Sequence, residues 1–309
     1  MKTLDAQATE QSLDFPRLIE ALREAFRGKV EVPLRHTHAV GGGTSLIMPA
    51  WDESFYGVKI INVFPGNSAR GLPGLHGTYV LFDARTGVPL LNIDGDVLTA
   101  YRTAAASALG ASYLAREDAS DLLIVGSGRV ASLIAPAMSA VRNIRRVRVW
   151  SRTHDNAAAL AKTLRGQGFD ASAIRSLDDG YDADIISCAT LSTDALIQGA
   201  KLEPGTHLDL IGSFKPDMRE ADGDCLARAA VFVDTDEAPA KSGDILSAVA
   251  EGNFSLDRIA ASLTDLASGR HLGRKSHDEI TLFKAVGNAR EDLAGAELVY
   301  GKHTDPAAG

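Results

Sequence analysis

Residues 122–138 read LLIVGSGRVASLIAPAM, in which an apolar run, a glycine-containing loop and a second apolar segment follow one another. The run is typical of a buried strand, and the second segment is typical of a helix. In the loop, Gly126 permits a tight turn and Gly128 lets the backbone approach a pyrophosphate, while the small Ala131 keeps helix and strand close. The stretch predicts a dinucleotide-binding βαβ unit with the cofactor at Gly126, Gly128, Arg129 and Val130. A tight turn without a nucleotide is the alternative.

A second predicted strand ends near residue 150 and is followed by Ser151, Arg152 and Thr153. An acidic residue at this place would bind a ribose 2′-hydroxyl and repel a 2′-phosphate. A guanidinium flanked by hydroxyls does the reverse, because arginine matches phosphate oxygens bidentately. The pattern predicts an NADP(H) pocket with Asn156 as a further donor, and NAD(H) is the other cofactor it allows. A surface arginine that merely follows a strand is the alternative interpretation.

Short apolar strands alternate with helical segments from about residue 121 onward. This alternation predicts a doubly wound parallel sheet, the Rossmann arrangement, over residues 116–279. Ligands bind such sheets beyond the carboxyl ends of the strands. Further cofactor contacts are therefore expected after the strands near residues 185 and 207, at Thr190, Leu191, Ile211 and Ser213.

The first third of the chain has a different pattern. A helix is predicted over residues 16–27, strands over 57–64, 77–83 and 87–94, and an Ala-rich helix over 97–115. A last helix is expected over 279–300, packing on the first domain. The fold class is therefore α/β, with a Rossmann domain joined to an α+β domain of residues 1–115 and 280–309.

Composition narrows the classes of partner. The 32 basic and 40 acidic residues give a net charge of −8, which argues against general binding to nucleic acids or to anionic membranes. Two cysteines in unrelated contexts support neither a disulfide framework nor a zinc site, so no metal is expected. No run of about 20 apolar residues is present, and a cytoplasmic location follows by default.

Several motifs in order, among them YGVKIINVFPGN (56–67), LTAYRTAAASALGASYLA (98–115), IVGSGRVA (124–131) and LFKAVGNAREDLA (282–294), resemble the ornithine cyclodeaminase/mu-crystallin family. The resemblance implies a homodimer in which the first domain binds the substrate and forms the dimer. It implies that Arg35 and Arg102 bind a substrate carboxylate, that Lys59 stands at the reaction centre, and that Thr103 contacts cofactor phosphate. The region around Arg152 is closer to the NADPH-using mu-crystallins than to the NAD-using cyclodeaminases.

The residues themselves agree in part. Lys59 lies in an apolar strand, where a charge without a purpose would be costly to bury. Two nearby guanidinium groups would lower its pKa and suit it to proton exchange near neutral pH. Asp292 is interpreted equally as a helix-surface charge, an interdomain charge or a ligand.

The chain departs from the family's cyclodeaminases at two carboxylates. Phe214 occupies the place of an aspartate, with Asp217 three residues on, and Leu46 that of a glutamate. The sequence GSFKPDMRE (212–220) resembles the mu-crystallin and ketimine reductase branch. We therefore predict an NADP(H)-dependent reductase of cyclic ketimine carboxylates, such as Δ1-pyrroline- or Δ1-piperideine-2-carboxylate. The alternatives are a cyclodeaminase or amino-acid dehydrogenase, and an NADPH-gated binding protein without turnover.

Overall fold

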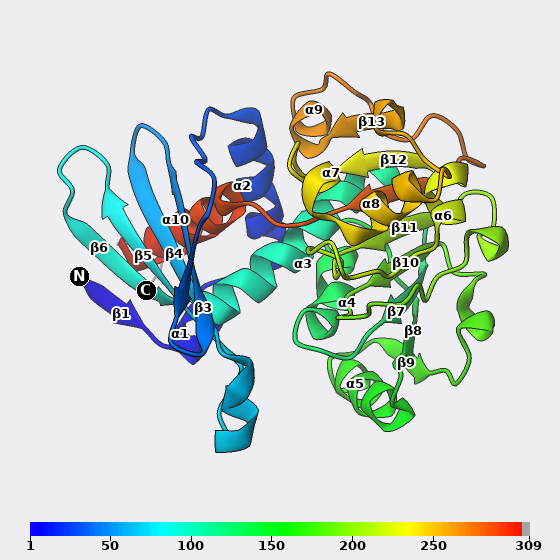
Figure 1. The fold of residues 1–309 in the computed structure, drawn as a ribbon, viewed down its shortest axis with the longest axis horizontal. Coiled ribbons are helices and arrows are strands. Elements are labelled where there is room, and N and C mark those ends of the chain that lie inside the picture. Colours follow the sequence, from blue (N-terminus) through cyan, green and yellow to red (C-terminus); the bar gives the residue numbers. More distant parts are fainter. Residues whose placement is uncertain (305–309) are drawn as a thin grey trace. The chain divides into compact units, whose positions relative to one another are not determined.

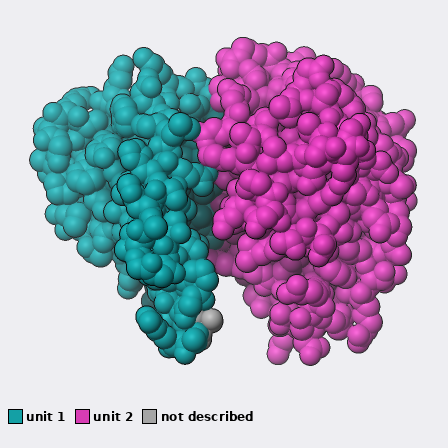
Figure 2. Space-filling view, viewed as in Figure 1, with its two compact units in different colours: residues 1–102, 288–309 teal, residues 103–287 magenta. Residues whose placement is uncertain are grey.

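The computed structural model describes residues 1–304 and separates the chain into two compact units. Unit 1 comprises Met1–Arg102 and the chain from Asn288 onward, and unit 2 comprises Thr103–Gly287; Figure 2 colours them separately. The sequence-based borders, after residues 115 and 279, differ from this division. Helix α3 (Gly95–Leu114) is continuous across the division after Arg102, and the strand over 281–284, which follows the second predicted border, belongs to the sheet of unit 2. Residues 305–309, which the sequence assigns to the first domain, lie outside the described residues.

Unit 1 is built on a six-stranded sheet in the order β1-β6-β5-β4-β3-β2. Its neighbours pair antiparallel except β1 and β6, which run parallel. Side chains alternate between the faces of β4, so that Gly57, Lys59 and Ile61 are buried on one face. The strands are β1 (Lys2–Leu4), β2 (His36–Val40), β3 (Gly43–Trp51), β4 (Phe55–Val63), β5 (Leu75–Asp83) and β6 (Pro89–Asp94).

Helices α2 (Phe15–Arg27) and α10 (Ala289–Thr304) pack on each other, and α10 also lies against β3, β4 and β5 (Figure 1). The Asp14 side chain accepts a hydrogen bond from the Arg17 amide and caps the amino end of α2. The buried face of α2 repeats at helical spacing through Leu18, Leu22 and Phe26. The predicted helix over 16–27 is therefore confirmed. Unit 1 also contains α1 (Ala6–Gln11) and the 3-10 helix η1 (Pro65–Arg70).

Unit 2 contains an eight-stranded, wholly parallel sheet in the order β13-β12-β14-β11-β10-β7-β8-β9. From β9 to β14 this is the doubly wound order, with the reversal of strand order between β7 and β10, so the predicted fold class is confirmed. The strands are β7 (Asp121–Val125), β8 (Arg146–Trp150), β9 (Asp170–Ala173), β10 (Ile185–Cys188), β11 (His207–Leu210), β12 (Ala230–Val233), β13 (Ile259–Ser262) and β14 (Thr281–Lys284).

Helices connect these strands (Figure 1). They are α4 (Ala131–Ser139), α5 (His154–Gly166), α6 (Gly223–Arg228), α7 (Ala238–Lys241), α8 (Gly243–Ala250) and α9 (Leu263–Ala267), with 3-10 helices η2 (Leu177–Gly180), η3 (Gly199–Lys201) and η4 (Leu256–Arg258). Across residues 1–304, no helix has the length and apolarity needed to cross a membrane.

The prediction of one helix over 279–300 is wrong. Residues 281–284 form β14, buried between β11 and β12, and α10 begins only at Ala289. A strand buried on both faces reads as an unbroken apolar run, which periodicity does not distinguish from a buried helix. The sheet that accepts β14 is formed by distant segments, so the tertiary context decides the conformation.

The contact between α2 and α10 is testable at Leu22, whose side chain is fully buried. Leu22→Ala is expected to lower the free energy of unfolding by about 2–5 kcal/mol, because it removes apolar contacts and leaves a cavity. Urea unfolding followed by circular dichroism measures the change. Glu20→Ala, on the exposed side of the same helix, is the matched control and should change little. Equal effects of the two substitutions would contradict this packing.

Candidate active site

A buried lysine lies at the centre of unit 1. Lys59 occupies a core-facing position of β4 with Met48 and Tyr79 as its partners on β3 and β5. Only 1% of its side chain is exposed, and its Nζ lies 2.6 Å from Oδ2 of Asp292 on α10. The carboxylate, itself fully buried, balances the ammonium charge where water cannot.

A buried arginine meets the same acid. Arg102 on α3 donates from Nε to Oδ1 of Asp292 at 2.9 Å and from Nη1 to Oε2 of Glu291 at 2.6 Å. Asp292 therefore joins Lys59 and Arg102 through its two oxygens. A guanidinium carries five N–H donors, more than these two bonds use.

Burial lowers the pKa of Lys59 to about 8, which is the largest influence on it; the Asp292 carboxylate opposes this shift and the Arg102 charge adds to it. Lys59 is therefore mostly protonated at neutral pH yet close to its titration range. The expectation that two guanidinium groups cause the shift is corrected, because burial is the largest cause and Arg102 alone among the arginines is a main influence. Arg35, which immediately precedes β2, is not among the main influences on the pKa of Lys59.

The sequence pattern does not indicate a role for Glu291, and it allows three interpretations of Asp292. Both are fully buried in the first turn of α10. Two adjacent acids at the start of a helix usually face solvent and favour its dipole, so the pair carries no signal alone. The prediction that Lys59 is buried could have indicated an acidic partner, because a buried charge needs a counter-charge.

In unit 2, the glycine loop follows β7 as predicted. Gly126 has a φ of +126°, and a Cβ there would meet the carbonyl oxygen of Ala189 at 2.5 Å, so only glycine fits beside the end of β10. A Cβ on Gly128 would meet nothing within 4 Å, which leaves space above the loop. Helix α4 begins beyond it, and Val130 at its N-cap provides no side-chain cap. Open space at the amino end of a helix that has no side-chain cap fits a pyrophosphate.

The residues predicted to bind the adenosine ribose lie at the end of β8. The hydroxyls of Ser127 and Ser151 are 3.0 Å apart, which ties this strand end to the glycine loop. Arg152, Thr153 and Asn156 are exposed around the start of α5. These side chains are therefore accessible from solvent. Thr103, the remaining predicted phosphate contact, lies on α3 directly after Arg102.

The residues predicted after β10 and β11 differ in accessibility. The side chain of Leu191 is 78% exposed, whereas Ile211 and Ser213 are buried. Thr190 donates from its amide and its hydroxyl to the buried Glu220, and the Ser213 hydroxyl donates to the carbonyl of Met218. The hydroxyls of Thr190 and Ser213 therefore form hydrogen bonds within the protein that stabilise these loops.

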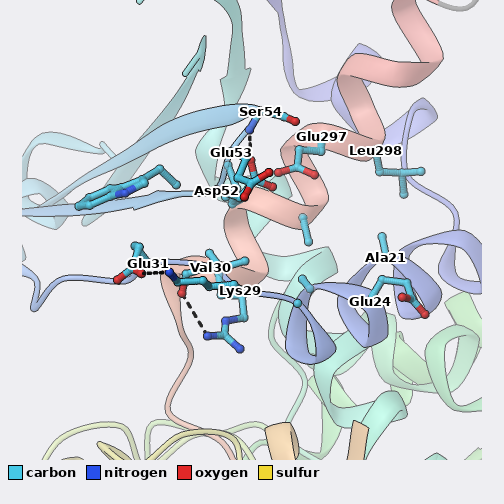
Figure 3. A pocket seen from close by; sticks show the side chains of 16 residues that line it. Ala21, Glu24, Lys29, Val30, Glu31, Asp52, Glu53, Ser54, Glu297 and Leu298 are labelled. Atoms are coloured by element: carbon cyan, nitrogen blue, oxygen red, sulfur yellow. Dashed lines mark hydrogen bonds and ion pairs between the residues drawn. The ribbon is translucent and has the colours of Figure 1, made fainter. Parts of the chain in front are cut away.

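Unit 1 also contains a hollow of about 780 Å³ between α2, α10 and the turn from β3 to β4 (Figure 3). Figure 3 shows the carboxyl groups of Asp52 and Glu297 facing each other within it. Burial, followed by the nearby Asp52 carboxylate, raises the pKa of Glu297 to about 8. Lys59, Arg102 and Asp292 do not line this hollow. Five acidic residues line it, but only two basic ones, Lys29 and Arg290, so its charge does not suit a carboxylate ligand. Over residues 1–304, no group of His, Cys, Asp and Glu side chains could hold a metal ion.

Comparisons with known proteins place the chain among a group of amino- and imino-acid enzymes. The model of the ornithine cyclodeaminase/mu-crystallin family matches residues 4–306. The Delta(1)-pyrroline-2-carboxylate reductase of Paracoccus denitrificans is 42% identical over 261 residues, covering 83% of each chain.

Two solved structures are similar to this chain over nearly its full length. The Thermococcus litoralis Delta(1)-pyrroline-2-carboxylate reductase, in complex with NADH and L-proline, superposes with a TM-score of 0.92 at 33% identity, covering 98% of this chain and 97% of that one. An archaeal alanine dehydrogenase dimer with bound NAD gives a TM-score of 0.90 at 29% identity, covering 97% and 95%.

The role of Asp292 is testable through stability. Asp292→Asn removes the charge that Lys59 and Arg102 share, so the free energy of unfolding should fall by about 3–5 kcal/mol, as when one partner of a buried ion pair is lost. The pKa of Lys59 should fall further, because the Asp292 carboxylate raises it.

Urea unfolding at neutral pH measures the first effect. The matched control is Glu24→Gln, which removes an acid from the exposed pair with Arg27 and should have little effect. A loss from Asp292→Asn no larger than that of the control would show that the carboxylate does not support the two cations.

Proposed function

The chain belongs to the ornithine cyclodeaminase/mu-crystallin family, and we propose that it is an NADP(H)-dependent reductase of cyclic ketimine carboxylates of the pyrroline- or piperideine-2-carboxylate type. It is an NAD(P)-dependent oxidoreductase, as this family is. The observation that carries the substrate assignment is the buried Lys59, held by Asp292 beside Arg102. The relatives named as pyrroline-2-carboxylate reductases support the same assignment.

Arg102 binds the substrate carboxylate in this proposal, with Arg35 as the second cation. A guanidinium pairs with a carboxylate through two parallel hydrogen bonds and fixes its orientation. Asp292 and Glu291 hold Nε and Nη1 of Arg102, so the guanidinium is oriented before the substrate arrives. Such preorganisation lowers the cost of placing the imine carbon correctly.

Lys59 provides the proton for the imine nitrogen. Protonation makes the imine carbon electrophilic enough to accept a hydride, and the secondary amine that results retains that proton. With a pKa of about 8, Lys59 is charged at neutral pH and can still release the proton readily. Asp292 keeps the ammonium in place and balances its charge.

The nicotinamide dinucleotide supplies the hydride when bound. Gly126, Gly128 and the amino end of α4 would hold its pyrophosphate, and Ser151, Arg152 and Thr153 would face the adenosine ribose. The exposed Arg152, between two hydroxyl side chains, supports a preference for the 2′-phosphate of NADP(H). The Thermococcus and archaeal structures contain NADH and NAD, so this preference is what distinguishes the proposal from theirs.

Unit 1 is proposed as the substrate-binding and dimerisation domain, and the protein as a cytoplasmic homodimer. Strand β2 ends the sheet of unit 1, and all five of its residues are exposed. An unpaired strand edge is a natural surface for a second chain. The alanine dehydrogenase with 29% identity is described as a dimer.

The reductase assignment is tested by the absorbance of reduced nicotinamide with purified protein, NADPH and Δ1-piperideine-2-carboxylate. Substrate-dependent oxidation is expected, with a rate that falls as pH rises above about 8, because only protonated Lys59 donates. Lys59→Ala should lower turnover by about 10²–10⁴-fold, the usual contribution of a positioned proton donor, and leave the affinity for NADPH unchanged.

Lys29→Ala is the matched control, since Lys29 is an exposed lysine of unit 1 that lines the acidic hollow. Its turnover should equal that of the unaltered protein. Tight NADPH binding without oxidation of any cyclic ketimine would favour the binding-protein alternative. Ammonia release from ornithine without added reductant would favour a cyclodeaminase.

The cofactor preference is tested at Arg152. Arg152→Ala should raise the dissociation constant of NADPH tenfold or more and change that of NADH little, because only NADPH has the 2′-phosphate. Calorimetry with both cofactors measures this. Arg145→Ala, an exposed arginine just before the opposite end of β8, is the control and should alter neither value. An equal loss for both cofactors after Arg152→Ala would contradict the assignment of Arg152 to the phosphate.

A further inference from the structure

A fully buried carboxylate lies beneath the carboxyl edge of the sheet in unit 2. Glu220 lies ten residues after the end of β11, and its side chain has no exposed surface. Its Oε1 accepts hydrogen bonds from the Thr190 amide at 2.7 Å and from the Thr190 hydroxyl at 2.8 Å. Its Oε2 accepts the Gly212 amide at 2.6 Å. One side chain therefore joins the loop after β10 to the loop after β11.

The two loops and the carboxylate are packed closely at this point. A Cβ added to Gly212 would lie 2.0 Å from the carbonyl oxygen of Thr190 and 2.4 Å from Oε1 of Glu220. No side chain fits at residue 212 without moving the backbone of the other loop. Thr190 also follows Ala189, whose carbonyl oxygen excludes a side chain at Gly126. The glycine loop and both strand ends therefore meet at the reversal of strand order.

A second buried acid fixes the backbone that carries Glu220. Oδ1 of Asp244, in the first turn of α8, accepts the amides of Glu220 at 2.7 Å and Ala221 at 3.0 Å. The amide of Asp244 donates to the Ser213 hydroxyl at 3.0 Å. The loop after β11 is thus tied to α8 as well as to Glu220.

A buried lysine balances these acids. Lys284 at the end of β14 has no exposed surface, and its Nζ lies 3.2 Å from Oδ2 of Asp244. Its charge also lowers the pKa values of Glu220, Asp209 and Asp234, all of which burial raises. The reaction assigned to unit 1 uses none of these groups. Burying several charges is costly. A role in orienting the loops gives a reason for this cluster to be buried here.

We propose that Glu220 is a positioning residue for the dinucleotide, clamping the loops after β10 and β11 into the conformation that receives the cofactor. The inference rests on the proposed function, because it takes the carboxyl edge of this sheet as the cofactor site. Glu220 acts through Thr190 and Gly212 and does not itself touch the ligand.

The ionised form of Glu220 fits the clamp, because its oxygens accept three hydrogen bonds and a carboxylate accepts them more strongly than a neutral carboxyl group does. Burial raises the pKa of Glu220 to about 7, Asp244 adds to this shift, and Lys284 and the Thr190 bonds oppose it. Burial, followed by the Glu220 carboxylate, raises the pKa of the Cys188 thiol at the end of β10. Protonation below pH 7 should therefore loosen one loop and weaken cofactor binding.

The experiment is calorimetric titration of the full chain with NAD⁺ from well below to above pH 7. NAD⁺ is the probe because it lacks the 2′-phosphate, a group that titrates near neutral pH. The affinity of the unaltered protein should fall as pH decreases through about 7. Glu220→Gln should bind about tenfold more weakly above pH 7 and lose this pH dependence, since the amide cannot accept from both loops and does not titrate.

Thr190→Val is a second variant that needs no change at the buried acid. It removes the hydroxyl bond that lowers the pKa of Glu220, so the midpoint of the pH dependence should move upward. Glu251→Gln, which alters the exposed partner of Arg219, is the matched control and should keep the pH profile of the unaltered protein.

The proposal is overturned if the NAD⁺ affinity of the unaltered protein does not fall below pH 7. It is also overturned if the affinity of Glu220→Gln falls in the same way. If Glu220→Gln does not fold, an unmoved midpoint in Thr190→Val overturns it and an upward shift supports it. If neither NAD⁺ nor NADP⁺ binds at any pH, the cofactor assignment is contradicted and the clamp falls with it. If NADP⁺ alone binds, the same comparison with Glu220→Gln is made with NADP⁺.

Discussion

The ion pair between Lys59 and Asp292 determines how unit 1 is built. A buried ammonium needs a counter-charge, and the acid that supplies it comes from the last helix of the chain. Unit 1 therefore requires both ends of the sequence: the sheet is complete by residue 94, yet its buried lysine is balanced only once α10 has packed on it. Because Asp292 also holds Arg102, the same helix orients two cations of the proposed substrate site.

Unit 2 follows a related principle with different groups. Its sheet brings strand ends and loops to one edge, but loops carry no regular backbone hydrogen bonds of their own. Buried carboxylates supply those bonds: Glu220 accepts amides from two loops, and Asp234 accepts the amides of Val286 and Gly287 after β14. Lys284 provides the opposing charge. In each unit a buried lysine on a strand lies close to a buried acid, and that acid also holds another side chain or a loop in place.

The sequence was informative where a pattern has one physical cause. The glycine loop, the amphipathic α2 and the apolar strands β7, β10 and β11 follow from local steric and hydrophobic requirements. It was less informative where distant segments decide. Residues 281–284 look helical until the neighbouring strands are known, and Glu291 and Asp292 look like surface charges until Lys59 is seen beneath them. Glu220 carries no local pattern at all, because its role depends on where two loops end.

The most direct test of this account is a crystal structure of the protein with NAD⁺ and L-proline, the product expected from Δ1-pyrroline-2-carboxylate. We expect the proline carboxylate on the guanidinium of Arg102 and the ring nitrogen facing Nζ of Lys59, with Asp292 still joining the two cations. Proline bound away from Lys59 and Arg102, or in the acidic hollow beside Glu297, would contradict it.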